Sequence, residues 1–182
     1  MKKIRSYAVC IPLNGIILKK VSHLLNQVEL KFSLNFINKK NTRPHINLFS
    51  GTTNNITEII TTLRRNLINK NLNNEIKIFG YGAFLKKLPL IYIRFENSDY
   101  LKFIRELLFN KRKSWKRIDK ATYKNKWIPK STLFYRDLNI NNFYKILKYL
   151  NKLKLPNKMS INEIIIIDYS SSKEKEVGSI KL

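Results

Sequence analysis

The chain has 182 residues, of which 43% are hydrophobic, enough for one buried core, and we expect a single domain over residues 1–182. Its 36 Lys and Arg against 12 Asp and Glu give a formal net charge of +24. This charge attracts polyanions, nucleic acid first, although the abundance of lysine, asparagine and isoleucine also fits a coding bias. A lone cysteine, Cys10, excludes an internal disulfide, and no apolar run has the roughly 18 residues that span a bilayer. We therefore expect a cytoplasmic monomer with no membrane interaction.

Strands and helices alternate along the chain. Period-2 patterns mark the strands, and apolar residues spaced three and four apart mark the helices. Gly51 is expected to end the second strand, residues 85–89 to form a hairpin, and the basic stretch 110–123 to be a loop. The expected strands are residues 5–11, 43–50, 75–84, 90–95, 127–135, 161–168 and 177–182, and the apolar helix stripes cover residues 17–28, 56–67, 101–108 and 143–150.

This order of elements predicts an α+β fold. Two of the strands, 43–50 and 127–135, occupy comparable places, because each follows an irregular stretch and precedes a helix. The repetition predicts two pseudo-symmetric lobes.

The same short pattern occurs in both of these strands. Pro44 precedes His45-Ile46-Asn47-Leu48, and Pro129 precedes Lys130-Ser131-Thr132-Leu133. Because side chains alternate between the faces of a strand, His45 shares a face with Asn47, and Lys130 shares one with Thr132. Two such faces lining a shared cleft would form an active site.

His45 is the candidate proton-transfer residue, since histidine titrates near neutral pH. A satisfied core histidine is the alternative, and the other histidine, His23, is expected at a helix surface. Lys130 is the candidate second catalytic group. To act as an acid or base at neutral pH it needs its pKa lowered by about three units, whereas a permanently charged phosphate clamp needs no shift.

Asn47 and Thr132 are candidate phosphate donors, through an amide and a hydroxyl, although ordinary strand polarity also explains them. The basic stretch that follows residue 110 carries interleaved aromatic residues, which suits single-stranded RNA. We assign RNA contacts there to Arg112, Lys116, Lys126 and Trp127. The alternative is a solvated loop with Trp115 and Trp127 packed on the core, which we favour for these two aromatic residues. No metal-ligand spacing is present, and no cofactor is expected.

The motifs and their surroundings resemble the 2H phosphoesterase superfamily, the 2′-5′ RNA ligase-like and RNA 2′,3′-cyclic phosphodiesterase group. Members carry two His-x-Thr/Ser-x motifs across a cleft between two lobes. His45-Ile46-Asn47-Leu48 resembles the first motif, and Trp127-Ile128-Pro129-Lys130-Ser131-Thr132-Leu133 resembles the second, with Lys130 in place of its histidine. Residues 5–12 are similar to the family's first strand, and residues 80–92 to its middle hairpin.

The resemblance implies antiparallel sheets around a central cleft, with helices outside. It implies metal-independent acid/base chemistry on RNA ends or small cyclic nucleotide phosphates. His45 would exchange the proton, and Asn47 and Thr132 would hold the phosphate. Because Lys130 replaces a histidine, reduced activity is one expectation, and the alternative is an inactive RNA- or phosphate-binding module. A partner-binding scaffold with a merely compositional charge is a third possibility.

Overall fold

The computed structural model describes residues 4–34, 42–67, 73–85, 87–123, 127–135, 138–171 and 174–182. Their order confirms the expected α+β class. Strands are β1 Arg5–Pro12, β2 His45–Thr53, β3 Glu75–Phe84, β4 Leu90–Phe95, β5 Arg117–Ile118, β6 Lys130–Phe134, β7 Lys158–Ser160, β8 Glu163–Asp168 and β9 Lys175–Lys181. Helices are α1 Gly15–Phe32, α2 Ile56–Leu67, α3 Asp99–Asn110 and α4 Ile140–Leu150, with the short 3₁₀ turns η1 Arg112–Ser114 and η2 Lys120–Thr122.

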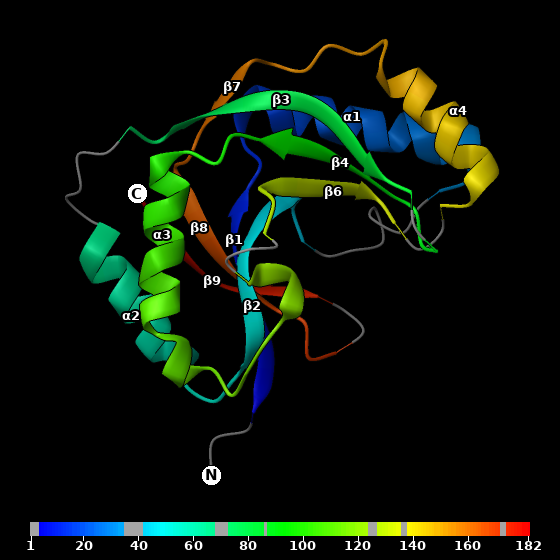
Figure 1. Cartoon of the computed structure of the whole chain (residues 1–182). Helices are drawn as coiled ribbons and strands as arrows, with labels where there is room; N and C mark the ends of the chain where they lie inside the picture. Colours follow the sequence, from blue (N-terminus) through cyan, green and yellow to red (C-terminus); the bar gives the residue numbers. More distant parts are fainter. Residues whose placement is uncertain are drawn as a thin grey trace.

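The described strands form one antiparallel sheet in the order β7-β3-β4-β6-β2-β1-β8-β9, with β5 added beside β2. Figure 1 shows β3, β4 and β6 crossing the view while β1 and β2 run down it, so the sheet curls where β6 meets β2. That meeting is narrow, because in the described part of the chain Ile46 and Ser131 form the only residue pair between β2 and β6. The two halves of the sheet therefore join at the two motifs.

Each half of the sheet has its own pair of helices (Figure 1). Helices α1 and α4 lie together beside the β3–β4–β6 half, where Tyr149 donates a hydrogen bond to Gln27 Oε1 at 2.7 Å. Helices α2 and α3 lie together beside the other half, where Lys111 Nζ pairs with Glu58 Oε1 at 3.1 Å. The expected antiparallel α+β fold with two halves and helices outside is confirmed, and the described strands form a single curled sheet. None of the described helices is long and apolar enough to cross a membrane.

The apolar stripes lie in the core as expected. The buried residues of α1 are Ile17, Val21, Leu24, Leu25 and Val28, which recur at helical spacing. Ser98 caps α3 by accepting a hydrogen bond from the Leu101 backbone N–H. Cys10 is buried in the sheet. Local periodicity therefore located these elements correctly.

The prediction that Gly51 ends the second strand is wrong. β2 continues to Thr53, and Gly51 pairs with Ile118 of β5. A Cβ built on Gly51 would lie 2.1 Å from the Arg117 carbonyl oxygen. The glycine is needed because another strand's backbone approaches it closely.

We expect Gly51→Ala to destabilise the protein by about 1–3 kcal/mol, the usual cost of overpacking a close contact. The measurement is urea-induced unfolding. Gly178→Ala is the matched control, because its new Cβ would meet only Ile60 Cδ1 at 3.8 Å, an ordinary contact. Equal stability of the two variants would contradict the proposed close approach of β5.

Two other expectations need correction, and one strand was not expected. The stretch 110–123 is not a simple loop, because η1, β5 and η2 lie within it. The strand expected over 127–135 begins only at Lys130. The sequence also gave no sign of β7, whose three residues pair with Glu75–Lys77. Two- and three-residue strands are too short to display a period, so tertiary pairing alone defines them.

Candidate active site

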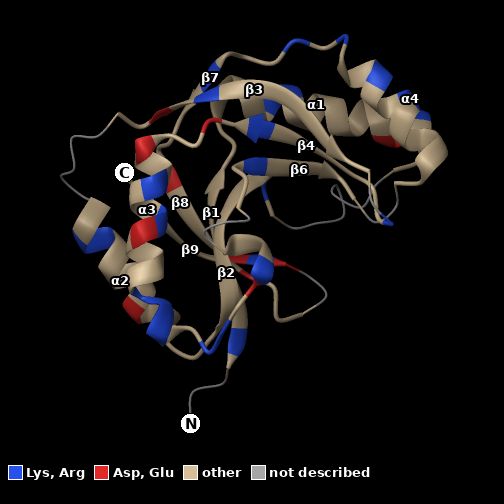
Figure 2. Ribbon diagram, in the orientation of Figure 1, with Lys and Arg blue, Asp and Glu red and all other residues tan. Residues whose placement is uncertain are grey.

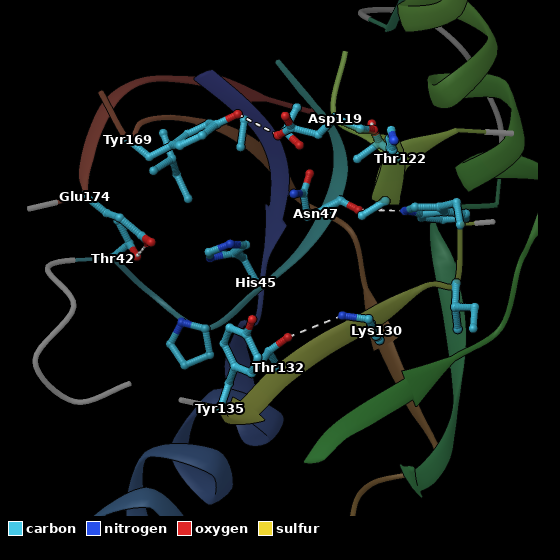
Figure 3. Close-up of a pocket in the computed structure, with 18 of the residues that line it drawn as sticks. Thr42, His45, Asn47, Asp119, Thr122, Lys130, Thr132, Tyr135, Tyr169 and Glu174 are labelled. Carbon is cyan, nitrogen blue, oxygen red and sulfur yellow. Dashed lines mark hydrogen bonds between the residues drawn. The ribbon is translucent and has the colours of Figure 1, made fainter. Parts of the chain in front are cut away.

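The two motifs meet at the Ile46–Ser131 pair, and both of these residues are fully buried. Side-chain alternation turns their neighbours to the opposite face, where His45, Asn47, Lys130 and Thr132 line one pocket of about 880 Å³ (Figure 3). We call it the central pocket. The structure thus brings the four motif residues together.

The antiparallel register sets how these four residues face one another. Counting outward from Ile46–Ser131, His45 lies opposite Thr132, and Asn47 lies opposite Lys130. His45 and Lys130 are therefore diagonal neighbours, a relation that in regular sheets separates residues by about 7–8 Å. Figure 3 shows the His45 ring in the middle of the pocket, between Asn47 and Thr132.

The ring of His45 is oriented by the segment just before β2. Nδ1 lies 2.8 Å from the Arg43 carbonyl oxygen, which can only accept a hydrogen bond. The neutral ring therefore carries its hydrogen on Nδ1 and its lone pair on Nε2. Nε2 is thus the atom suited to proton exchange.

The residue that supplies this carbonyl is itself fixed. Arg43 donates to Glu176 from its backbone N–H at 3.2 Å and from Nη2 at 2.9 Å, and to Glu163 from Nη1 at 2.9 Å. The hydrogen bonds to Glu176 and then Glu163 outweigh the effect of burial and raise the pKa of Arg43 above its ordinary value. Two carboxylates from β8 and β9 therefore hold the segment that orients His45.

Lys130 is half-buried, and its ammonium group donates to Thr132 Oγ1 at 3.4 Å. Nζ also lies 5.8 Å from the centre of the Tyr92 ring. No ion pair joins Lys130 to a carboxylate of the described residues, and burial lowers its pKa below the ordinary value. Because Thr132 accepts from Lys130, its own hydroxyl hydrogen remains for a ligand oxygen.

Asn47 contributes to the pocket through its side chain and its backbone. Its Oδ1 is buried and has no hydrogen-bond partner among the described residues, which typically costs about 1–3 kcal/mol. Its backbone oxygen accepts a hydrogen bond from Trp127 Nε1 at 2.7 Å. The orphaned oxygen indicates a place where a ligand donor would be stabilised.

Behind the pocket lies a buried arginine that the sequence reading missed. Arg105, only 6% exposed, donates to the carbonyl oxygens of Leu48 and Thr122, and its Cζ lies 4.0 Å from the centre of the Trp127 ring. Burial lowers its pKa to about 10. The sequence offered one signal for this buried arginine. Arg105 lies four residues after Leu101, so a charged residue occupies the apolar stripe of α3.

The far wall of the pocket is acidic. Tyr169 donates to Asp119 Oδ2 at 2.7 Å, and burial, followed by this hydrogen bond, raises the pKa of Tyr169. Thr42 donates to Glu174 Oε2 at 3.2 Å at another edge (Figure 3). Sequence reasoning missed these residues because they lie in segments far apart in the chain.

The predicted RNA-contact residues are dispersed. Arg112 and Lys116 are exposed and do not line the central pocket, and Lys126 lies outside the described residues. Trp127 lines the pocket with its ring stacked against Arg105, and Trp115 is 5% exposed, packed on Phe49. Lys and Arg occur on both lobes (Figure 2), so charge alone does not locate a ligand.

The described residues contain no group of three or more His, Cys, Asp or Glu arranged for a metal ion.

Neither a protein-family model nor a curated protein sequence matches the chain. Solved structures match over its full length. E. coli LigT complexed with 3′-AMP has a TM-score of 0.57 at 11% identity, covering 99% of both chains. Kluyveromyces marxianus Usb1 has a TM-score of 0.53 at 11% identity, covering 100% of this chain and 99% of its own. LigT complexed with phosphate has a TM-score of 0.52 at 9% identity, covering 99% of this chain and 98% of its own. The chain therefore has the fold of LigT and Usb1, the 2H phosphoesterase fold.

Proposed function

We propose that the central pocket binds the phosphate of an RNA end or of a small cyclic nucleotide and hydrolyses its phosphodiester bond without a metal ion. The observation that carries this proposal is the register around Ile46–Ser131. This register sets His45, the proton carrier, opposite the hydroxyl of Thr132. It sets Lys130, which carries the ammonium group, opposite the amide of Asn47. Such a group of donors suits an anion with several oxygens.

For a 2′,3′-cyclic phosphate, the reaction adds one water molecule. His45 Nε2 removes a proton from that water as its oxygen forms a new bond to phosphorus. The bond between phosphorus and one ribose oxygen breaks, and this oxygen takes a proton from the Lys130 ammonium group. Solvent then removes the proton from His45 and returns one to Lys130.

The environment of Lys130 supports its part in this reaction. Burial lowers the pKa of Lys130, so its ammonium group releases a proton more readily than an exposed lysine does. A bound phosphate acts in the opposite direction, because an anion stabilises the charged lysine. Lys130 thus first holds the phosphate and then protonates the departing oxygen. Asn47 Nδ2 and the Thr132 hydroxyl donate to the non-bridging oxygens.

The shared fold adds support for the class of ligand. LigT has been solved with 3′-AMP and with phosphate. A nucleotide of this size fits a pocket of about 880 Å³, since ligand pockets commonly measure about 300–1,000 Å³.

A second candidate function is phosphate or RNA binding without turnover. It is favoured by Lys130 itself, because a lysine supplies positive charge more easily than a transferable proton. Under this alternative His45 would donate a hydrogen bond to the bound phosphate. The fold and the pocket would be the same.

The test is incubation of the purified protein with adenosine 2′,3′-cyclic phosphate and with a 2′-5′-linked dinucleotide in excess EDTA. Chromatography should reveal a monophosphate product that forms faster than without protein. Binding of 3′-AMP is measured in parallel by calorimetry. Binding without product would support the second function, and absence of both would exclude phosphate recognition at this pocket.

A further inference from the structure

A second depression, which we call the outer depression, adjoins the central pocket. Its volume is about 420 Å³, and it is lined by the segment Trp115–Lys120 and by Tyr123. Asp119 and Lys120 line both spaces. The two spaces are therefore neighbours along residues 119–120.

The outer depression has an excess of positive charge. Lys116, Arg117 and Lys120 are all exposed, and none of them forms an ion pair with a carboxylate of the described chain. The one carboxylate in the lining is that of Asp119, which accepts the Tyr169 hydrogen bond. Three unpaired cations against one engaged carboxylate suit an anion.

Two aromatic residues distinguish this place from the other basic surfaces. The Trp115 indole N–H is buried and lacks a hydrogen-bond partner among the described residues, although an indole nitrogen can only donate. A buried donor without an acceptor is costly, so an oxygen that reached this N–H would stabilise it. Tyr123 is 44% exposed, so its side chain offers an aromatic surface on which a base can stack.

We propose that the outer depression is a second phosphate subsite, which holds the next phosphate of an RNA chain whose end occupies the central pocket. This inference rests on the proposed function for the position of that end. RNA fits better than an anionic membrane, because the depression is concave and shares Asp119 and Lys120 with a nucleotide-sized pocket. The preferred substrate is then an oligonucleotide and not a mononucleotide.

The segment that builds the subsite is held against β2 by its backbone. The Lys116 N–H donates to the Thr52 carbonyl at 2.8 Å, and the Asp119 N–H donates to the Ser50 carbonyl at 2.9 Å. The side chains of Lys116 and Arg117 can therefore be changed without removing the bonds that position the segment.

The test is the double variant Lys116→Gln/Arg117→Gln, compared with Lys145→Gln/Lys148→Gln, which removes equal charge from exposed residues of α4. Dissociation constants are measured for 3′-AMP and for a short adenosine oligonucleotide that ends in the same 3′-phosphate. Wild type should bind the oligonucleotide at least tenfold more tightly. The Lys116/Arg117 variant should lose this preference and keep its affinity for the mononucleotide. Its plot of log affinity against log salt should be shallower by about 0.7 for each lost phosphate contact.

The subsite would be overturned if wild type bound the two ligands with equal affinity, or if the α4 control lost as much oligonucleotide affinity as the Lys116/Arg117 variant. It would also be overturned if the Lys116/Arg117 variant lost affinity only for phosphatidylserine vesicles. The last would make a lipid headgroup the anion. If no mononucleotide binds but the oligonucleotide binds through Lys116 and Arg117, the subsite stands and the proposed function of the central pocket fails. Circular dichroism spectra confirm that each variant is folded.

Discussion

Replacement of His45 by alanine is expected to lower the rate of cyclic-phosphate hydrolysis by about 10² to 10⁴-fold, the usual contribution of one positioned acid/base group. The physical reason is the geometry of the ring. Its Nδ1–H is bonded to the Arg43 carbonyl, so Nε2 carries the lone pair that takes the proton from water. No other histidine lines the central pocket. The measurement is kcat/KM for adenosine 2′,3′-cyclic phosphate.

Two further variants separate proton transfer from other effects. His45→Asn keeps a polar side chain of similar reach without a group that titrates near neutral pH, so it should be as inactive as His45→Ala. His23→Ala removes the other histidine, which is exposed on α1, and should retain full activity. Near-normal turnover by His45→Asn would assign His45 a binding role and refute the acid/base mechanism.

Replacement of Lys130 by methionine is expected to weaken 3′-AMP binding by about 10- to 100-fold, because a hydrogen bond to a charged group contributes about 1.5–3 kcal/mol. The same variant should be more stable than wild type near neutral pH. Burial lowers the pKa of Lys130, which means that the folded protein disfavours the ammonium form relative to the unfolded chain. Methionine has a similar shape and no charge to desolvate. Calorimetry and urea-induced unfolding measure the two effects.

The lowered pKa of Lys130 fixes how anion affinity and protein stability change with pH. An anion binds the protonated lysine, so affinity should be highest below the lowered pKa and should decrease as pH rises through it. Between this pKa and the ordinary value of 10.5 the unfolded chain binds more protons at this residue, so the stability of wild type relative to Lys130→Met should rise with pH. Lys130→Arg stays protonated and should retain affinity at higher pH.

Lys148→Met, a change at an exposed lysine of α4, is the control for the loss of one charge. It should leave the binding of 3′-AMP within error of wild type. If Lys148→Met and Lys130→Met weaken binding equally, the effect comes from the net charge of the protein, and Lys130 is not a phosphate ligand.

Much of the fold was predictable because its signals are local. The stripe from Ile17 to Val28, for example, depends on residues within a few positions of one another. Gly51 shows where local reasoning fails. Glycine commonly ends a strand, but here it lies within β2 because the Arg117 carbonyl approaches it from a segment 66 residues later (117 − 51).

The candidate site likewise has features that the sequence predicts and features that depend on tertiary contacts. Side-chain alternation, read from the sequence, predicted that His45 and Asn47 share one face of their strand. It predicted the same for Lys130 and Thr132. The sequence also placed a lysine, Lys130, at the position in the second pattern that matches His45 in the first. These are properties of consecutive residues, for which the two-residue repeat of an extended chain is a sufficient guide.

Only the tertiary structure decided how the two faces meet. The single Ile46–Ser131 pair sets His45 opposite Thr132 and Asn47 opposite Lys130, a register that neither strand encodes alone. Burial of Lys130, the stacking of Arg105 on Trp127 and the wall shared by the two cavities depend likewise on contacts between distant segments. The sequence by itself thus determined which groups are available for chemistry. Packing determined their partners, their exposure and the pKa of Lys130, because desolvation and cross-strand register exist only once the chain has folded.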